Sequence, residues 1–151
     1  MSDLNHSSLD FQLTASSAFF NNITYASPVV PTLYTALTSG ELATNAQIYG
    51  TYTHSFVLAK DEIVQLVIDN LDSGRHPFHL HGHNFQALYR SEDDAGVFAD
   101  SNITEADFPS MPMRRDTFVL HPNGNMVLRF KADNPGMYLS SATKQYNRNP
   151  S

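Results

Sequence analysis

The chain of 151 residues has the length of one globular domain that can bury a hydrophobic core. Fifteen acidic against nine basic residues give a formal net charge of −6, which disfavours binding to nucleic acid or to anionic lipid. The sequence has no cysteine, which excludes disulfides and thiolate metal ligands, and no apolar run of the roughly 20 residues needed to cross a bilayer.

A leading segment and one short helix are expected in the first third of the chain. Residues 1–30 alternate polar clusters with short aromatic patches and end in Ser-Pro-Val-Val-Pro, which indicates a leading segment or linker. From Thr32, leucines and an alanine recur at helical spacing until Gly40. We therefore expect one short helix there, with its apolar face packed against the domain.

Five later stretches predict short β-strands, because apolar and polar residues alternate in them between turn signals. They are Ser55–Leu58, Glu62–Asn70, Asn84–Arg90, Arg115–Pro122 and Asn125–Gly136. The last two flank a Pro-Asn-Gly turn and predict a hairpin whose inner face carries Met126, Leu128, Phe130 and Ala132. Short strands without a long amphipathic helix favour an all-β sandwich or barrel over an α/β fold.

The predicted domain ends near Gly136. After that residue the apolar content drops, the alternation stops, and asparagine and serine accumulate. This change predicts a divergent, disordered tail over residues 137–151. The domain itself is therefore expected to span residues 31–136.

Four of the seven histidines fall within the eight residues from His76 to His83. Pro77 excludes a helix interior and favours extended backbone before it. On an extended segment His79, His81 and His83 point to one side, whereas His76 points to the other. One ribbon can thus serve two metal sites, and neutral imidazole suits copper, zinc, iron or nickel. The alternative of packing or surface histidines is disfavoured by four in so short a stretch.

These residues resemble a known family. The stretch HPFHLHGHNFQ, His76–Gln86, is similar to the copper motif in the third domain of multicopper oxidases, the family of laccases and ferroxidases built from cupredoxin sandwiches. The segments PTLYTALTSGELATN, FVLAKDEIVQLVIDN, MPMRRDT and LRFKADNPG resemble, in order, the same domain of fungal iron-uptake ferroxidases. The likeness covers residues 21–136 and implies a cupredoxin (plastocyanin-like) Greek-key β-sandwich.

The resemblance also implies roles for single residues. His76 would be a ligand of type 1 copper, His79 of type 2 copper, and His81 of the type 3 pair. His83 matches the motif but is not expected to bind copper. Asp72 lies where fungal ferroxidases carry an acid that helps to bind Fe(II) and to pass its electron to type 1 copper, and a carboxylate suits Fe(II). Without the resemblance, Asp72 is better explained as an ordinary residue of an Asp-Ser-Gly turn.

The residues after Gly136 depart from the family pattern. In the family, ADNPG is followed within a few residues by an HCHxxxH segment, which supplies the cysteine and second histidine of type 1 copper and two more ligands of the trinuclear cluster. Here MYLSSATKQYNRNPS stands in that place, without cysteine or histidine. We therefore expect a chain truncated before that segment and a sandwich incomplete at its C-terminus. Type 1 copper needs two histidines and a thiolate and should not form on this chain.

The function implied is that of a copper-binding domain in a ferroxidase-type multicopper oxidase, which oxidises Fe(II) and reduces O2 to water for iron uptake. Because the chain lacks the cysteine and most of the histidine ligands, we expect it not to turn over alone. Two alternatives stay open. One is a non-enzymatic module that binds copper weakly through His79 and His81, with or without His83. The other is a fragment of a laccase that oxidises phenols, against which Asp72 argues.

Partners and location follow from the resemblance alone. It implies the other cupredoxin domains of a full-length oxidase, an iron permease in the family context, and the cell surface. The first 13 residues, in contrast, are polar without Lys or Arg and do not match an export signal. Asn5, Asn22 and Asn102 begin Asn-X-Ser/Thr tripeptides, which accept glycans only in the secretory pathway. The remaining histidines stand alone and are expected to have no metal role: His6, His54 and His121.

Overall fold

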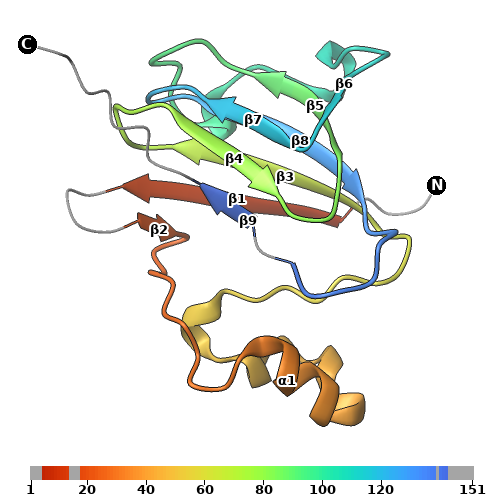
Figure 1. Ribbon diagram of the computed structural model, residues 1–151. Coiled ribbons are helices and arrows are strands. Elements are labelled where there is room, and N and C mark those ends of the chain that lie inside the picture. The colour runs from red at the N-terminus through yellow and green to blue at the C-terminus, as the bar shows by residue number, and fades with distance from the viewer. Residues whose placement is uncertain (1–4, 14–17, 139, 143–151) are drawn as a thin grey trace, which may run out of the picture.

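Two β-sheets and a small helical lobe make up the protein in the computed structural model, which describes residues 5–13, 18–138 and 140–142 (Figure 1). The larger sheet has the spatial order β2 (Ala18–Phe20), β1 (Asn5–Leu13), β3 (Ile63–Asn70), β8 (Asn125–Lys131), β5 (Phe85–Arg90) and β6 (Met113–Arg115). The smaller sheet has the order β7 (Thr117–Leu120), β4 (His76–Leu80) and β9 (Ser140–Ala142). β1 runs parallel to β3, and the other neighbouring strands are antiparallel.

The hydrophobic core lies between the two sheets. Alternation along β8 turns Met126, Leu128 and Phe130 inward, where each is at most 7% exposed. They form one cluster with Phe78 of β4 and Leu120 of β7, which come from the smaller sheet. Burial of one such side chain stabilises the fold by about 1.5–3 kcal/mol. The predicted all-β sandwich and the predicted inner face of β8 are confirmed.

One predicted strand is absent from the structure. β3 and β5 occupy the stretches predicted as Glu62–Asn70 and Asn84–Arg90. Ser55–Leu58, however, has no regular secondary structure, and the strand prediction there is wrong. The stretch connects the helical lobe to β3 and pairs with none of the described strands. Its residues Phe56 and Val57 are therefore left exposed.

β7 and β8 do not form the predicted hairpin. β7 pairs with β4 in the smaller sheet, whereas β8 pairs with β3 and β5 in the larger one. The turn between them bonds instead to the loop of residues 91–112 between β5 and β6, called the acidic loop for its aspartates and glutamates. Asp94 N donates to the Pro122 carbonyl, and Gly96 N donates to the Asn123 carbonyl. The chain therefore crosses from one sheet to the other at this turn, and the hairpin prediction is wrong.

The two ends of the chain contribute strands to the sheets. β1 and β2 lie within the predicted leading segment and extend the larger sheet, with β1 paired along β3. β9 lies within the tail predicted to be disordered, yet it pairs with β4. The rest of that tail prediction, residues 139 and 143–151, lies outside the described residues, as do residues 1–4 and 14–17. The domain limits 31–136 stay a prediction.

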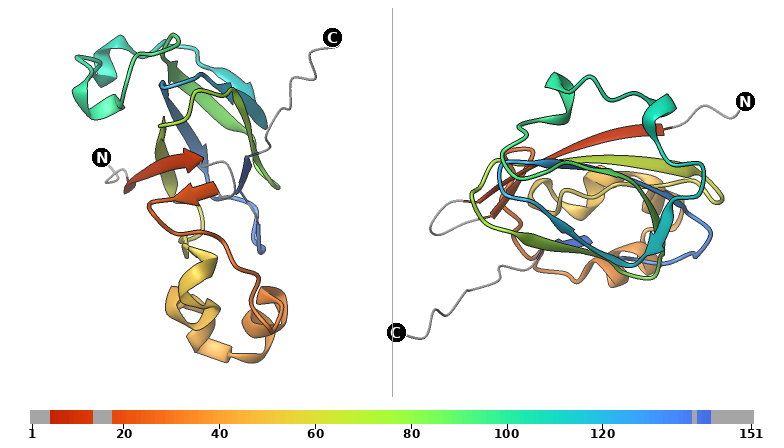
Figure 2. Two further views of the ribbon diagram at one scale, coloured as in Figure 1. Left: turned by 90° about the vertical axis from the view of Figure 1, so that its left-hand side faces the viewer. Right: turned by 90° about the horizontal axis from the view of Figure 1, so that it is seen from above.

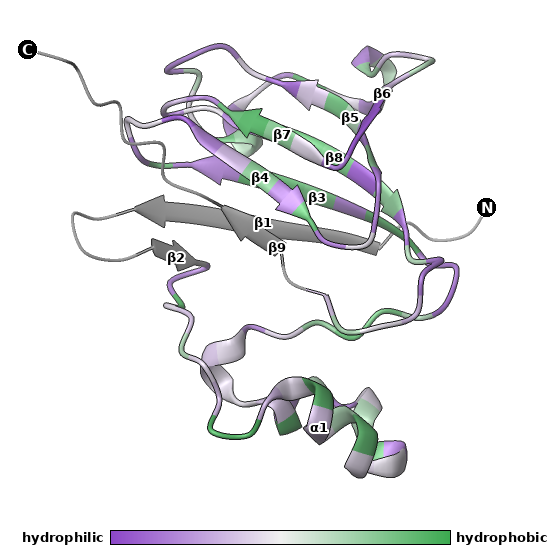
Figure 3. Ribbon diagram, viewed as in Figure 1, coloured by the Kyte–Doolittle hydropathy of each residue, from purple (hydrophilic) through white to green (hydrophobic). Residues whose placement is uncertain are grey.

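The helical lobe stands apart from the sandwich (Figure 2). It contains the predicted helix, α1 (Thr32–Thr38), and three short 3-10 helices, η1 (Gly40–Thr44), η2 (Ala46–Tyr49) and η3 (Thr51–Thr53). The expected packing of the α1 apolar face is wrong, because Leu33 is 54% and Leu37 is 74% exposed. Figure 3 shows hydrophobic positions along α1, in the lobe outside the two sheets. Inside the lobe, the buried Tyr49 donates from its hydroxyl to the Ala43 carbonyl at 2.7 Å.

The long loop between β5 and β6 carries two more 3-10 helices, η4 (Phe98–Asp100) and η5 (Glu105–Asp107). It is tied to the larger sheet by Asp69, whose Oδ1 accepts a hydrogen bond from Phe98 N at 2.7 Å. Within the described part of the chain, none of the helices has the length and apolar character needed to span a membrane.

Candidate metal centre

The strand β4 carries the first part of the histidine motif, and the extended backbone determines where His76 and His79 lie. Pro77, the second residue of the strand, pairs with Val119 of β7 in a backbone that stays extended from His76 to Leu80. His76 lies at the first position, and its side chain is only 2% exposed. His79 lies near the other end of the strand with a side chain 37% exposed. The strand therefore separates one buried histidine from one that solvent reaches.

His76 is held by a carboxylate. Its Nε2 lies 3.1 Å from Oδ1 of Asp72, whose side chain is 20% exposed. An ionised carboxylate can only accept hydrogen bonds, so Nε2 donates, and the lone pair of the neutral ring lies on Nδ1. A histidine that gives one N–H to a carboxylate and keeps a lone pair on the other nitrogen has the arrangement typical of a metal ligand.

The turn before β4 brings Asp72 to this position. Gly74 N donates to the same Oδ1 of Asp72, as expected for the Asp-Ser-Gly turn. A Cβ on Gly74 would lie 2.7 Å from Asp72 Oδ1 and 3.2 Å from His76 Nε2. Glycine is therefore required here by the close approach of the two side chains. A role of Asp72 in the turn is compatible with a role beside a metal ligand, because Oδ1 contacts both Gly74 N and His76 Nε2.

Gly74→Ala is expected to separate Asp72 from His76 while leaving the sandwich folded. The added methyl group occupies the space in which the two side chains meet, and loss of a charge-assisted hydrogen bond costs about 1–3 kcal/mol of unfolding free energy. Urea unfolding measures that loss, and the imidazole ¹⁵N shift of His76 reports the broken contact. Ser73→Ala, at an exposed position of the same turn, is the matched control. An unchanged His76 signal in Gly74→Ala would contradict this account.

His79 and His81 are brought together at the far end of β4. Their ring centroids are 4.7 Å apart. Nδ1 of His79 lies 2.9 Å from the backbone carbonyl of Asp116 and 3.2 Å from Oγ1 of Thr117. Because a carbonyl only accepts, Nδ1 carries the proton, and the lone pair of the neutral ring lies on Nε2. His79 thus also has the protonation pattern of a metal ligand.

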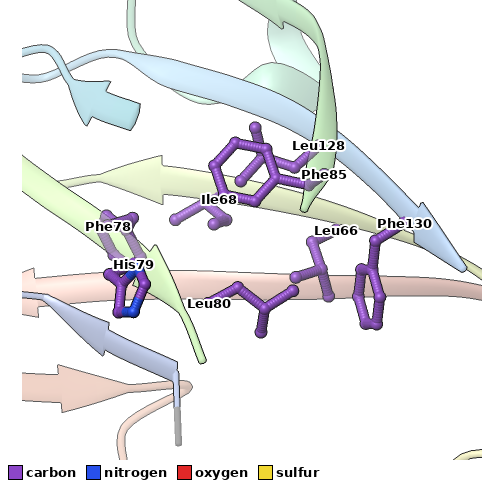
Figure 4. A pocket seen from close by; sticks show the side chains of 8 residues that line it. All are labelled: Leu66, Ile68, Phe78, His79, Leu80, Phe85, Leu128 and Phe130. Carbon is purple, nitrogen blue, oxygen red and sulfur yellow. The ribbon is translucent and has the colours of Figure 1, made fainter. Parts of the chain in front are cut away.

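His79 lies beside Phe78 and Leu80 on one side of an apolar pocket between the sheets (Figure 4). The opposite side of the pocket is lined by residues of the larger sheet: Leu66, Ile68, Phe85, Leu128 and Phe130. The Asp116 carbonyl and the Thr117 hydroxyl, both within hydrogen-bond distance of Nδ1, fix the orientation of the His79 ring.

His83 takes a different place from its two neighbours. Its ring packs against Phe130 at 5.4 Å and against Tyr138 at 4.9 Å between centroids, and its Nδ1 lies 3.3 Å from the carbonyl of His81. Gly82, with φ +73°, turns the chain between the two histidines. That His83 does not bind copper stays a prediction.

The histidines do not complete a copper site by themselves. Among the described residues, no group of three or more His, Cys, Asp or Glu side chains is arranged to hold a metal ion. The sequence also offers no cysteine for a blue copper centre. His76, His79 and His81 therefore fit copper as single ligands, and further ligands must be supplied by other residues.

The other histidines lie outside this arrangement. His121 is 9% exposed, and its Nδ1 lies 3.3 Å from Asp93 Oδ1, a carboxylate that also accepts from Arg75 at 2.7 Å. His54 packs on Phe56 at 4.9 Å between ring centroids, and burial lowers the pKa of its imidazole.

Sequence reasoning missed three contributors to the site: the Asp116 carbonyl, Gly74 and the buried Asn70. A backbone carbonyl has no sequence signal, whereas Gly74 stands visibly between Asp72 and His76.

Comparisons with known proteins agree on one family. The multicopper oxidase family model matches residues 25–142. The chain is 67% identical over 122 residues to an iron transport multicopper oxidase of Gibberella zeae and 56% identical over 126 residues to one of Saccharomyces cerevisiae. These matches cover 81% and 80% of the chain but only 20% of either relative. The chain thus spans about a fifth of the length of the curated relatives it matches.

Solved structures show the same fold. The crystal structure of Fet3p, a multicopper oxidase that functions in iron import, is 46% identical with a TM-score of 0.83, covering 91% of this chain and 28% of that one. A laccase from Botrytis aclada is 29% identical with a TM-score of 0.64, covering 91% of this chain and 25% of the laccase. The predicted cupredoxin-type sandwich is confirmed, and the two sheets do not close into a barrel.

Proposed function

The chain belongs to the multicopper oxidase family, and from that premise we propose that it is a copper-binding domain of an iron-transport oxidase that oxidises Fe(II) and reduces O2 to water. The observation that carries the ferroxidase assignment is the contact of 3.1 Å between Asp72 Oδ1 and His76 Nε2. A partly exposed carboxylate, which is a suitable ligand for Fe(II), thereby touches the imidazole proposed for type 1 copper.

The metal roles follow positions on β4. His76 would hold type 1 copper, His79 type 2 copper, and His81 one ion of the type 3 pair. Copper bound there would supply the one-electron steps between Fe(II) and O2. The residues of this chain do the positioning: Asp72 binds and orients Fe(II) beside His76, and the Asp116 carbonyl fixes the ring of His79.

The missing ligands define the proposed partners. A thiolate and further histidines would come from residues outside these 151: an HCHxxxH segment of the kind that follows ADNPG in the family, and the other cupredoxin domains of a longer oxidase. We place that oxidase at the cell surface, with an iron permease as the partner that takes up the oxidised iron. On its own, this chain is expected to oxidise no Fe(II), because it has no cysteine for the copper that accepts the electron.

Two other functions fit part of the observations. The adjacent rings of His79 and His81 favour a non-enzymatic module that binds copper without sulfur. The match to the Botrytis aclada laccase favours a phenol oxidase, although its identity of 29% is lower than the 46% to Fet3p. Asp72 beside His76 is the feature that favours Fe(II) over phenols.

A chimaeric oxidase tests the proposal. Residues 25–136 of this chain replace the matching segment of the Gibberella zeae relative, which supplies the remaining ligands. The chimaera is expected to bind copper, to be blue and to oxidise Fe(II) with a specificity constant within about tenfold of the unaltered relative. A folded chimaera without blue copper would overturn the copper roles. A blue chimaera that oxidises phenols but not Fe(II) would replace the ferroxidase by a laccase.

A further inference from the structure

Asn70, the last residue of β3, is a buried amide close to the Asp72 turn. Its side chain is 1% exposed, and an amide buried to this extent destabilises the fold unless it is hydrogen-bonded. Its Nδ2 donates to the Gly74 carbonyl at 2.9 Å and to the His121 carbonyl at 2.8 Å. Its Oδ1 accepts from Asp72 N at 3.0 Å. Three hydrogen bonds of one side chain thus reach two separate stretches of backbone.

These bonds join the turn to the smaller sheet. The Gly74 carbonyl belongs to the turn that precedes β4, whereas the His121 carbonyl directly follows Leu120, the residue paired with His76 across β4 and β7. Asn70 therefore ties the start of β4 to the end of β7 from the side of the larger sheet. Its own backbone N–H donates to the Gly124 carbonyl at 2.8 Å, which fixes the amide itself.

The backbone of Asp72 is held on both sides. Asn70 Oδ1 accepts from its N–H, and its carbonyl accepts from Asn123 N at 2.9 Å. Within the turn, Gly74 N holds the carboxylate through Oδ1. The Gly74 bond sets the carboxylate relative to the turn, and the bonds of Asn70 and Asn123 tie the turn to the neighbouring segments. The direction of the carboxylate thus depends on residues outside the turn as well as on the turn itself.

We propose that Asn70 is a positioning residue: its amide holds the Asp72–Gly74 turn against the end of β7 so that the Asp72 carboxylate meets His76. The role of Asp72 toward Fe(II) rests on the proposed function, whereas the positioning of its carboxylate rests on the hydrogen bonds alone. Asparagine suits the task because it offers two N–H donors and one acceptor on a short, stiff side chain.

The matched control is Asn125, at the start of β8. It is also 1% exposed, and its Nδ2 donates to the Gly96 carbonyl at 2.8 Å, so it holds the acidic loop and not the Asp72 turn. Replacement of either asparagine by alanine removes a buried amide of the same size. A purely structural role of Asn70 predicts the same result for both variants.

The test uses the full chain and NMR. In Asn70→Ala we expect the Gly74 amide to exchange with solvent about tenfold faster or more and the imidazole ¹⁵N signal of His76 to move, whereas Asn125→Ala leaves both unchanged. Asn70→Ser, which leaves room for water to reach the stranded carbonyls, replaces the alanine variant if that one does not fold. A His76 signal that stays unchanged, or moves equally in the Asn125 variant, would overturn the proposal.

The chimaeric oxidase separates this inference from the proposed function. There, Asn70→Ala is expected to raise KM for Fe(II) about tenfold, with kcat and the blue copper absorption unchanged. A fall in kcat with KM unchanged would overturn the positioning role. If the parent chimaera itself does not oxidise Fe(II), the proposed function fails, and the NMR comparison still decides the role of Asn70.

Discussion

Replacing His79 and His81 together by alanine is expected to weaken Cu(II) binding by the 151-residue chain strongly, whereas His76→Ala leaves it unchanged. The first two rings lie 4.7 Å apart, and solvent reaches His79, whose side chain is 37% exposed. His76 is 2% exposed and engaged by Asp72, so an ion from solution cannot reach it without opening the fold. Loss of both imidazoles should weaken binding by about 100-fold or more, which corresponds to about 2.7 kcal/mol.

Electron paramagnetic resonance during a Cu(II) titration measures this binding. The parent chain is expected to give type 2 signals without the intense blue absorption of a thiolate complex, because it has no cysteine. His121→Ala serves as the control, since His121 lies against Asp93 and outside the β4 pair. Binding that survives the double replacement would mean that copper uses other donors. Binding lost in His76→Ala would show that His76 and the His79–His81 pair do not bind copper independently.

The separation of His76 from His79 was predictable because it depends on local backbone geometry. Pro77 and the alternation of a strand were enough to predict that His76 is separated from His79, and the structure places one buried beside Asp72 and the other near solvent. The assignment of each to a type of copper stays a prediction, because it came from the family resemblance. The metal-ligand pattern of His79 was not predictable, since it depends on the Asp116 carbonyl, which lies 37 residues away.

The fold was predictable where apolar alternation met a turn signal. β3, β5 and the inner face of β8 agree with the pattern, because their apolar side chains alternate into the core. The pattern failed where partners are distant in sequence. The β7–β8 hairpin is the clearest case, since its turn bonds to the acidic loop while each strand pairs elsewhere. Local pattern gives strand direction, but pairing depends on which backbone groups lie close in space.

The Asp72 end of the sandwich combines contacts from three segments. Asn70 comes from β3, His121 follows β7, and the turn itself precedes β4. Each is unremarkable in sequence, and a turn aspartate alone would be explained by its Asx hydrogen bond. The additional fact is that the oxygen bonded to Gly74 N also meets a buried imidazole. A carboxylate that shares one oxygen in this way leaves its second oxygen to bind a cation.

Asp72→Asn in the chimaeric oxidase is expected to lower kcat/KM for Fe(II) by about 10- to 100-fold, because it removes the charged ligand of the iron and keeps the shape of the turn. The amide oxygen of asparagine can still accept from Gly74 N, so the fold and the blue absorption should be unchanged. Steady-state kinetics with Fe(II) and with a phenol measure the effect, and kcat/KM for the phenol should change by about twofold or less.

The control removes the same charge at a neighbouring site. Asp93→Ala eliminates a carboxylate that lies 2.7 Å from the guanidinium of Arg75, one residue before His76, and 3.3 Å from Nδ1 of His121. Equal losses of Fe(II) oxidation in the two variants would mean that Asp72 acts only through the negative charge of this end of the domain. An equal loss for Fe(II) and phenol in Asp72→Asn would mean that it supports the copper ligand and not the iron. Coulomb attraction from a partly exposed carboxylate is screened within about 10 Å, so a general effect of negative charge should be similar for the two aspartates. A loss of activity that is confined to Fe(II) and to the Asp72 variant therefore indicates direct binding of the ion.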